Sequence, residues 1–335
     1  MKEVNWGIIG CGDVTEVKSG PPLYKVDNSN LVAVMRRNEN LAQDYATRHK
    51  VPHYYTDADK LINNPQVNAV YIATPPDTHC EYTLRVATAG KPVYVEKPMA
   101  RNYAECLKMI AACDKAGVPL FVAYYRRALP NHLKVKELID SGAIGQVRFV
   151  NVRLYWPWNQ KIQDEGSLPW RIDPHTSGGG FFFDLASHTF DYLDFVFGPI
   201  TRAKGITANQ SGLYAAEDIV AASFEFSSGV VGNGLWCFSA SSVSETETIE
   251  IVGDKGHIEF SSFSQGPIRL ETADGLQIFE PDTPQHVHLP LVKTIVDDLL
   301  QRGTCPSTGR SGARSSWIMD EITKGAYCHQ SIRRK

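Results

Sequence analysis

The stretch GIIGCGDVTEVKSGPP, from Gly7 to Pro22, decides the fold of the first part of this chain. A short apolar run leads into Gly10 and Gly12, and a helix can begin directly after them. A dinucleotide's pyrophosphate binds backbone N–H groups at a helix N-terminus, and glycines let the chain come that close. However, Thr15 fills the third small position of this fingerprint, and Gly20-Pro21-Pro22 ends the helix early. The motif predicts a cofactor site, and its alternative is a plain tight turn.

Strand and helix patterns alternate through the first third of the chain. The apolar, β-rich runs are NWGIIG, LVAVM, AVYIAT, PVYVE and PLFVAYY. Between them lie helix-like stretches such as THCEYTLRVATAG and AECLKMIAACDKAG, which close on Gly90 and Gly117. Near-continuous apolar strands separated by helices predict a parallel sheet covered on both faces. We therefore predict an α/β fold that begins with a Rossmann-type, doubly wound domain over residues 1–123.

The pattern changes beyond Gly145, where one strand-like run follows another. These runs are QVRFVNVRLYW, DIVAASFEF, GVVGNGLWCF, ETIEIVG and GHIEF. Helix-like stretches precede and follow them, namely HLKVKELIDSG, LVKTIVDDLLQRG and RSSWIMDEITKGAYCH. The pattern predicts a second α/β domain, residues 124–335, dominated by an antiparallel sheet.

Composition narrows the classes of partner. The chain has 335 residues, and 43% of them are hydrophobic. Its formal net charge is -3, and no basic block occurs before Arg333-Arg334-Lys335. We therefore predict no nucleic-acid partner. No segment approaches the roughly 18 apolar residues of a membrane span. The seven cysteines include no CxxC pair, and the N-terminus lacks the apolar stretch of a signal peptide, so we expect a cytoplasmic protein. His286 and His288 have no acid nearby except Asp282, so we predict no metal site.

The end of the second predicted strand bears on which nicotinamide cofactor fits. An NAD site usually places Asp or Glu there, but this chain reads LVAVMRRNE, with Arg36 and Arg37 in that place. A carboxylate would repel a 2′-phosphate, whereas a guanidinium binds one through paired hydrogen bonds. We therefore predict NADP(H) in preference to NAD(H). The alternative is an arginine that stacks on adenine or is solvated.

Residues that directly follow each parallel strand are candidates for the chemistry, because ligands of open α/β sheets bind there. They are Thr74-Pro75-Pro76, Glu96-Lys97-Pro98 and Tyr124-Tyr125-Arg126-Arg127. Lys97 stands out because Pro92 and Pro98 bracket its stretch and limit its freedom. The alternative is an ordinary solvated lysine. The Lys97–Pro98 bond has two possible isomers, and the sequence does not choose between them.

A second cluster lies in GGGFFFDLASHTFDYLDFVFG, residues 178–198. Its three glycines permit close approach of the backbone to a ligand. Asp184 and His188 are four residues apart and share a helical face, where a carboxylate can hold an imidazole in one tautomer. Asp191 lies one turn further along. The alternative is a capping aspartate and a half-buried histidine on an amphipathic helix.

Together these motifs resemble those of one family. The GxG turn, TPPDTH at 74–79, EKP at 96–98, Trp170-Arg171 and the GGGxxxDxxxH that ends at His188 are similar to motifs of the Gfo/Idh/MocA oxidoreductases, whose type members act on glucose, inositol and related polyols. The resemblance covers residues 4–200 by motif. It implies a Rossmann domain followed by an α/β domain with a large, mostly antiparallel open sheet. One face of that sheet commonly forms the subunit interface, so we expect a homodimer or homotetramer.

The resemblance also implies the site residues. Lys97, Asp184 and His188 become the catalytic set. His188 suits the proton transfer at a substrate hydroxyl, Lys97 would stabilise a developing alkoxide or act as the base, and Asp184 would orient the pair. The implied cofactor-binding residues are Gly10, Gly12, Asp13, Val14, Arg36, Arg37, Thr74, Pro75, His79, Glu96, Lys97, Trp170 and Arg171. Two departures from the family are Arg36, in place of the commoner acid, and Tyr125, where many members have a smaller polar residue.

A polyhydroxy substrate is indicated by the stretch LYWPWNQKIQDEGSLPWRIDPHTSGGG, residues 154–180. Its aromatic residues can stack on a sugar face and its polar ones can bind hydroxyls, although the aromatics can equally close an interface. The aromatic residues are Tyr155, Trp156, Trp158 and Trp170, and the polar ones are Asp164, Arg171, Asp173 and His175. The predicted substrate contacts are Lys97, Tyr125, Tyr155, Trp158, Asp184 and His188.

These observations predict an NADP(H)-dependent oxidoreductase that acts on a CH–OH group of a sugar or cyclitol. One alternative keeps the fold and changes the substrate to a linear tetrapyrrole or an aromatic dihydrodiol. Another is a redox sensor that binds NADP without turnover. The joint presence of Lys97, Asp184 and His188 argues against the sensor.

Overall fold

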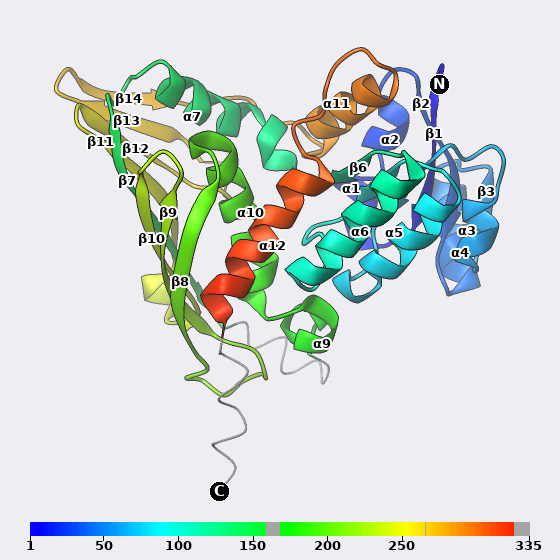
Figure 1. Ribbon diagram of the computed structural model, residues 1–335, viewed down its shortest axis with the longest axis horizontal. Coiled ribbons are helices and arrows are strands. Elements are labelled where there is room, and N and C mark those ends of the chain that lie inside the picture. The colour runs from blue at the N-terminus through cyan, green and yellow to red at the C-terminus, as the bar shows by residue number, and fades with distance from the viewer. Residues whose placement is uncertain (159–167, 265, 325–335) are drawn as a thin grey trace, which may run out of the picture. The chain divides into compact units, whose positions relative to one another are not determined.

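The structure is a computed structural model that describes residues 1–158, 168–264 and 266–324 (Figure 1). The chain forms two compact units. The first consists of Met1–Leu129 together with a returning segment, Pro284–Ala313, and the second of Pro130–Thr283 and the chain from Arg314 onward. The returning segment is not indicated by the sequence pattern. The division of function between residues 1–123 and 124–335 stays a prediction.

The first unit contains the predicted parallel sheet. Its strand order is β3-β2-β1-β4-β5-β6, and every neighbouring pair is parallel, which is the order of a Rossmann fold. The strands are β1 Val4–Ile9, β2 Ser29–Met35, β3 His53–Tyr55, β4 Ala69–Ile72, β5 Val93–Val95 and β6 Leu120–Val122. The helices are α1 Asp13–Val17, α2 Pro22–Lys25, α3 Glu39–Arg48, α4 Ala58–Ile62, α5 His79–Thr88, α6 Tyr103–Ala116, α11 Leu289–Leu299 and the first part of α12, Gly309–Thr323.

Two separate cores cover the two faces of this sheet, as the near-continuous apolar strands predict. Successive strand side chains point to opposite faces, so Tyr71 belongs to one core and Ile72 to the other. On the face of Tyr71 the apolar side chains of α11 join the core, including Leu291 and Ile295. Each such buried side chain stabilises the fold by about 2 kcal/mol. A helix that begins only at Leu289, far beyond the last strand of this sheet, thus completes the first unit.

The second unit contains an eight-stranded sheet, order β14-β13-β12-β11-β7-β10-β9-β8. All its strand pairs are antiparallel except β10 with β7. The strands are β7 Val147–Pro157, β8 Ile200–Ala208, β9 Ile219–Phe226, β10 Val231–Ala240, β11 Thr246–Gly253, β12 Gly256–Phe260, β13 Ile268–Thr272 and β14 Gly275–Phe279. The predicted mostly antiparallel sheet is confirmed, and β8, β13 and β14 extend it beyond the strands that we predicted.

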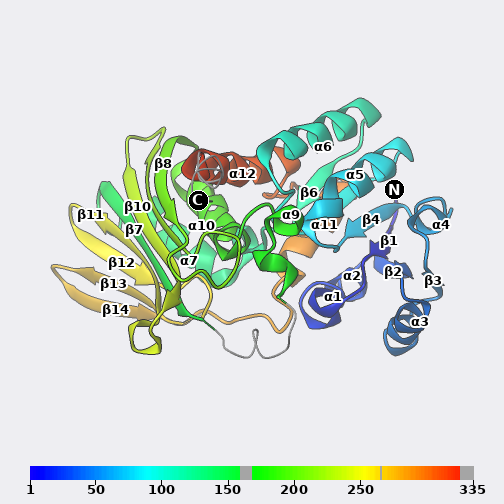
Figure 2. The ribbon, with the colours of Figure 1, turned by 90° about the horizontal axis from the view of Figure 1, so that it is seen from below.

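Among the residues that the structure describes, helices cover only one face of the second sheet (Figure 2). They are α7 Pro130–Asp140, α10 Phe181–Phe197 and the part of α12 from Arg314; the short α9, Pro174–Ser177, precedes α10. The core on that face includes Phe182 and Phe190 of α10, both fully buried. The opposite face is open. No helix in the described part of the chain has the length and apolar character needed to cross a membrane. The helix predicted over residues 314–329 is described only to residue 324.

Candidate active site

The glycine turn has space for a ligand at one glycine and none at the other. Gly10 follows β1 with a φ of +90°, and a Cβ there would lie 2.6 Å from Cγ2 of Thr74, so only glycine fits. Gly12 is the N-cap of α1, and the nearest atom to a Cβ there would be 3.9 Å away. The surface over Gly12 is therefore open to a pyrophosphate, with the exposed Asp13 and the half-buried Val14 beginning the helix.

Thr15 and Gly20 together replace the missing third glycine. Thr15 is buried, and its Oγ1 donates a hydrogen bond of 2.7 Å to the carbonyl of Gly12. The Thr15 carbonyl accepts a hydrogen bond of 2.9 Å from the Tyr45 hydroxyl. A Cβ on Gly20 would lie only 2.1 Å from that carbonyl oxygen, so close packing of the chain is provided five residues later than usual. The turn keeps its cofactor-binding geometry although its helix is short.

Arg36 lies beside the glycine turn. It directly follows β2, is half-buried, and its Nη1 donates a hydrogen bond of 3.3 Å to the carbonyl of Cys11. The amides of Gly10 and Cys11 in turn donate to the carbonyl of Met35, which fixes the strand end against the turn. Arg37 is exposed to solvent. Both arginines thus directly follow β2, and Arg36 lies against the glycine turn.

The loops after β4 and β5 are held together by His79. This residue is fully buried, its Nε2 is 2.7 Å from the carbonyl oxygen of Thr74, and its Nδ1 is 3.1 Å from that of Pro98. Burial lowers the pKa of the imidazole. Because carbonyl groups surround both ring nitrogens, His79 serves the proposed cofactor site by fixing these loops. Thr74 and Pro75 are half-buried, and the Lys97–Pro98 bond is cis.

Glu96 is the centre of a buried polar network that the sequence did not reveal. One carboxylate oxygen accepts a short hydrogen bond from the Tyr71 hydroxyl, and the other accepts the backbone amide of Lys97 at 3.1 Å. The ring Nε2 of His288, in the returning segment, lies 3.9 Å from Glu96 Oε1. Tyr94 bonds to the other nitrogen of that ring at 2.9 Å. Burial raises the pKa of both tyrosines, so both hydroxyls stay protonated.

In the second unit, Asp184 and His188 lie in the first two turns of α10. Asp184 is largely buried and pairs with Arg171, whose Nε is 3.3 Å from the carboxylate. The guanidinium also lies 4.5 Å from the ring centre of Trp170, so both residues of the Trp-Arg pair lie near the helix start. His188 is 3% exposed, and its ring contacts Phe263 edge-on at 6.2 Å. Asp191, one turn on, is also buried.

The three glycines before α10 are needed for backbone conformation and packing, and close approach to a ligand stays a prediction. Gly178 ends α9 with a φ of +89°. A Cβ on Gly179 would lie 2.1 Å from the Phe183 ring, and one on Gly180 would lie 2.8 Å from the Ala216 side chain. Protein atoms thus fill the space beside the last two glycines.

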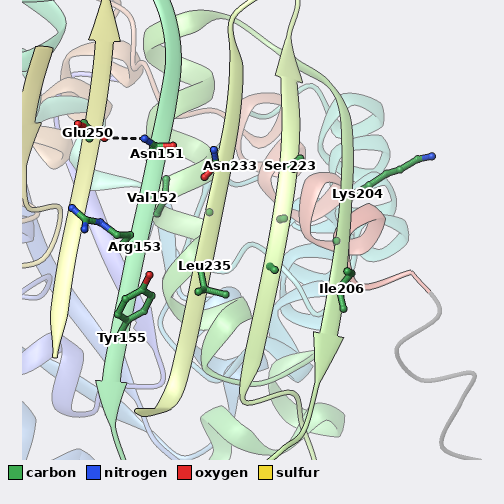
Figure 3. Close-up of a pocket in the computed structure, with 14 residues that line it drawn as sticks. Asn151, Val152, Arg153, Tyr155, Lys204, Ile206, Ser223, Asn233, Leu235 and Glu250 are labelled. Carbon is green, nitrogen blue, oxygen red and sulfur yellow. Dashed lines mark hydrogen bonds between the residues drawn. The ribbon is translucent and has the colours of Figure 1, made fainter. Parts of the chain in front are cut away.

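The aromatic candidates are distributed over different environments. Tyr155 points away from the core face of β7, on which Leu154 is buried, and lines a groove of about 950 Å³ on the open face of the sheet (Figure 3). The core that includes α10 lies on the other face of the sheet, and a substrate contact of Tyr155 stays a prediction. Trp158 stacks on Tyr214 at 5.5 Å in a small apolar cluster.

The remaining candidate residues, Tyr125, Asp173 and His175, contact neighbouring side chains or cap a helix. In the first unit, the ring of Tyr125 lies 4.6 Å from that of His288. Asp173 caps α9 by accepting the amide of His175. Asp164 lies outside the described residues.

Comparisons with known proteins agree with this architecture. Residues 4–124 match the model of an oxidoreductase family with an NAD-binding Rossmann fold, and residues 132–259 match the GFO/IDH/MocA C-terminal domain. Oxidoreductase P35 of Formosa agariphila is 39% identical over 317 residues, which are 95% of this chain and 97% of that protein. The myo-inositol 2-dehydrogenase of Thermotoga maritima is 29% identical over 80% of this chain and 78% of its own. A solved levoglucosan dehydrogenase, in complex with NADH and levoglucosan, shares the fold with a TM-score of 0.85 at 22% identity, covering 97% of this chain and 98% of that one.

Proposed function

The chain belongs to the Gfo/Idh/MocA family of oxidoreductases, and from this premise we propose that it transfers a hydride between NADP(H) and a carbinol or carbonyl carbon of a sugar or cyclitol. It is an oxidoreductase with an NAD(P)-binding Rossmann domain. The preference for NADP(H) and the substrate class are the proposal. Relatives named for myo-inositol and levoglucosan support a polyhydroxy substrate.

The glycine turn and Arg36 support the choice of cofactor. Space over Gly12 suits a pyrophosphate, and Gly10, Asp13 and Val14 would complete its cradle. Arg36 is fixed beside that turn by its bond to the Cys11 carbonyl and carries a fork of donors that suits a 2′-phosphate. Arg37 would add a second positive charge, and the second strand ends without a carboxylate that would repel the phosphate. The Thr74–Pro75 and Glu96–Lys97 loops, with Trp170 and Arg171, would bind the rest of the cofactor.

The protein's part in the reaction is to hold the substrate and move one proton. Bound NADP(H) would supply or accept the hydride. His188 would exchange the proton of the reacting hydroxyl, and the Lys97 ammonium would stabilise negative charge that develops on that oxygen. Asp184, whose charge Arg171 partly balances, would orient His188 or bind a neighbouring hydroxyl. Tyr125, Tyr155 and Trp158 stay proposed substrate contacts.

A substrate screen tests this proposal. Purified protein is incubated with aldoses, ketoses and inositols, each with NADP⁺ and with NAD⁺, and reduced nicotinamide is followed by its absorbance. We expect turnover of at least one polyol, faster with NADP⁺. An aromatic dihydrodiol in the panel tests the alternative substrate class. Turnover of the dihydrodiol alone would overturn the substrate class, and equal rates with both cofactors would overturn the role of Arg36.

We also propose that the open face of the second sheet binds a second copy of the chain. The groove there is lined by small residues such as Ala221 and Ser223 and by larger ones such as Tyr155 (Figure 3). Ile206 at its edge is 78% exposed, which is unusual for a large apolar residue of a strand. Arg153 and Glu250 provide opposite charges on the same face. Light scattering should give the mass of a dimer or tetramer, and a monomer would refute the interface.

A further inference from the structure

Two histidines of the returning segment attach it to different parts of the first unit. His286 contacts the α1–α2 region, where its Nδ1 lies 2.6 Å from the carbonyl oxygen of Val17 and its Nε2 lies 2.6 Å from Nζ of Lys25. His288 contacts the end of β5 through Tyr94 and Glu96. The two side chains are close in sequence and both buried, yet they have no partner residue in common. Because their partners differ, a substitution of His286 can serve as the control for a substitution of His288.

The surroundings of the His288 ring fix its protonation state. The ring is 1% exposed, and the cations that act on it are Lys18, Lys97 and Arg126. Burial, with these positive charges, lowers the pKa of His288 to about 3. The ring is therefore neutral at physiological pH and carries one N–H group.

The position of that N–H group follows from the partners. A carboxylate attracts an N–H group and repels a lone pair, so the proton is favoured on the nitrogen nearer to Glu96, although the 3.9 Å separation is too long for a hydrogen bond. Nε2 is that nitrogen. The other nitrogen, Nδ1, then accepts the hydroxyl proton of Tyr94 at 2.9 Å. In the reverse tautomer a lone pair would face the carboxylate, which is repulsive at low dielectric.

We propose that His288 is a positioning residue for Lys97, acting through the Glu96 carboxylate. The Tyr71 hydroxyl donates a hydrogen bond to one oxygen of that carboxylate, and Nε2 of His288 lies 3.9 Å from the same oxygen, close enough for an electrostatic interaction. The other oxygen accepts the Lys97 amide. Because its ring is neutral, His288 interacts with Glu96 without adding a positive charge beside Lys97. An effect of His288 on catalysis depends on the function proposed above for Lys97. An effect of His288 on the position of Lys97 does not depend on that function.

Three substitutions separate this role from simple packing. His288→Phe keeps an aromatic ring against Tyr125 and removes both nitrogens. His288→Gln keeps an N–H group near the position of Nε2 and should rescue the phenotype. His286→Phe, the matched control, removes the same type of side chain from the same segment and leaves the Glu96 contacts intact. If His288→Phe does not fold, Tyr94→Phe, which removes only the bond to Nδ1, takes its place.

Amine labelling at Lys97, relative to the exposed Lys255, reports its position without any turnover. The protein is treated with acetic anhydride over a range of pH, and peptide mass spectrometry gives the ratio of labelling at Lys97 to labelling at Lys255. We expect His288→Phe to change this ratio by about three-fold or more, which corresponds to a displacement of the labelling profile by about half a pH unit. His288→Gln and His286→Phe should keep the wild-type ratio. An unchanged ratio in His288→Phe, or an equal change in His286→Phe or His288→Gln, would overturn the proposal.

Turnover gives a second, independent readout. We expect His288→Phe to lower kcat by about ten-fold or more, because small misplacements of a catalytic group are costly. The Kd for NADPH, measured by fluorescence, should change by less than about two-fold. A lower kcat with an unchanged labelling ratio would refute positioning through Glu96. If labelling responds as expected and no substrate is turned over by the wild type, the positioning role stands and the proposed function fails.

Discussion

Replacing His288 by glutamine should flatten the dependence of the protein's stability on pH below neutrality. The folded protein keeps this imidazole neutral, because burial and nearby cations lower its pKa from 6.5 to about 3. The unfolded chain has no such constraint and gains a proton near its ordinary pKa. The contribution of neutral His288 to stability is therefore fully present above pH 6.5 and is lost as the pH falls toward the folded-state value.

The size of the effect follows from the two pKa values. Each pH unit between them changes the free energy of unfolding by about 1.4 kcal/mol. From about pH 7 to about pH 5 the wild type should lose about 2 kcal/mol more than His288→Gln, because glutamine does not titrate. Other groups, such as the buried His79, titrate in both proteins and cancel in the comparison.

Urea unfolding followed by circular dichroism measures this difference. Curves are recorded for both proteins at several pH values, and the difference in free energy of unfolding is plotted against pH. We expect this difference to change in favour of the glutamine variant as the pH falls. Two curves that stay parallel would mean that His288 takes up its proton at the same pH in the folded and the unfolded protein, which would refute a ring that stays neutral below pH 6.5.

Four further substitutions test the cofactor turn and the open sheet face. Gly12→Ala should weaken NADPH binding by about ten-fold or more and leave the melting temperature almost unchanged, because the nearest protein atom to its Cβ would be 3.9 Å away, an ordinary contact. Gly20→Ala should instead cost about 2 kcal/mol of stability, because its Cβ would lie 2.1 Å from the Thr15 carbonyl oxygen. A lower melting temperature in Gly12→Ala by calorimetry, or weaker NADPH binding without a loss of stability in Gly20→Ala, would contradict these roles. Arg36→Ser should lower the affinity for NADPH by about ten-fold or more and that for NADH little, so equal losses in titrations would disprove recognition of the 2′-phosphate. Ile206→Glu should shift the mass found by light scattering toward the monomer, and an unchanged mass would exclude this face as the interface.

The sequence predicts the first unit well where local pattern decides the structure. Apolar runs such as AVYIAT and PVYVE are strands because both faces of a parallel sheet are buried. The same local reasoning does not place α11, because its amphipathic pattern is compatible with either unit. His288 was missed for a related reason, since its partners Tyr94 and Glu96 lie almost 200 residues earlier in the chain.

The alternation of buried and exposed side chains along β7 indicates on which face of the sheet Tyr155 lies. Val150, Val152 and Leu154 are buried, while Arg153 and Tyr155 lie on the other side. A strand with period two places Tyr155 on the polar face, away from the helix that packs on the apolar one. The polar edge strand β8 gave no apolar run at all. Its alternating side chains were therefore not recognised as a strand.

The most direct test of the proposed enzyme compares the wild type with Lys97→Met. The assay follows reduced nicotinamide with NADP⁺ and a polyol that the screen identifies, and a parallel titration measures the Kd for NADPH. We expect Lys97→Met to abolish measurable turnover and to leave the Kd within about three-fold, because Lys97 acts on the reacting oxygen. Wild-type turnover in the variant would contradict the proposed catalytic set.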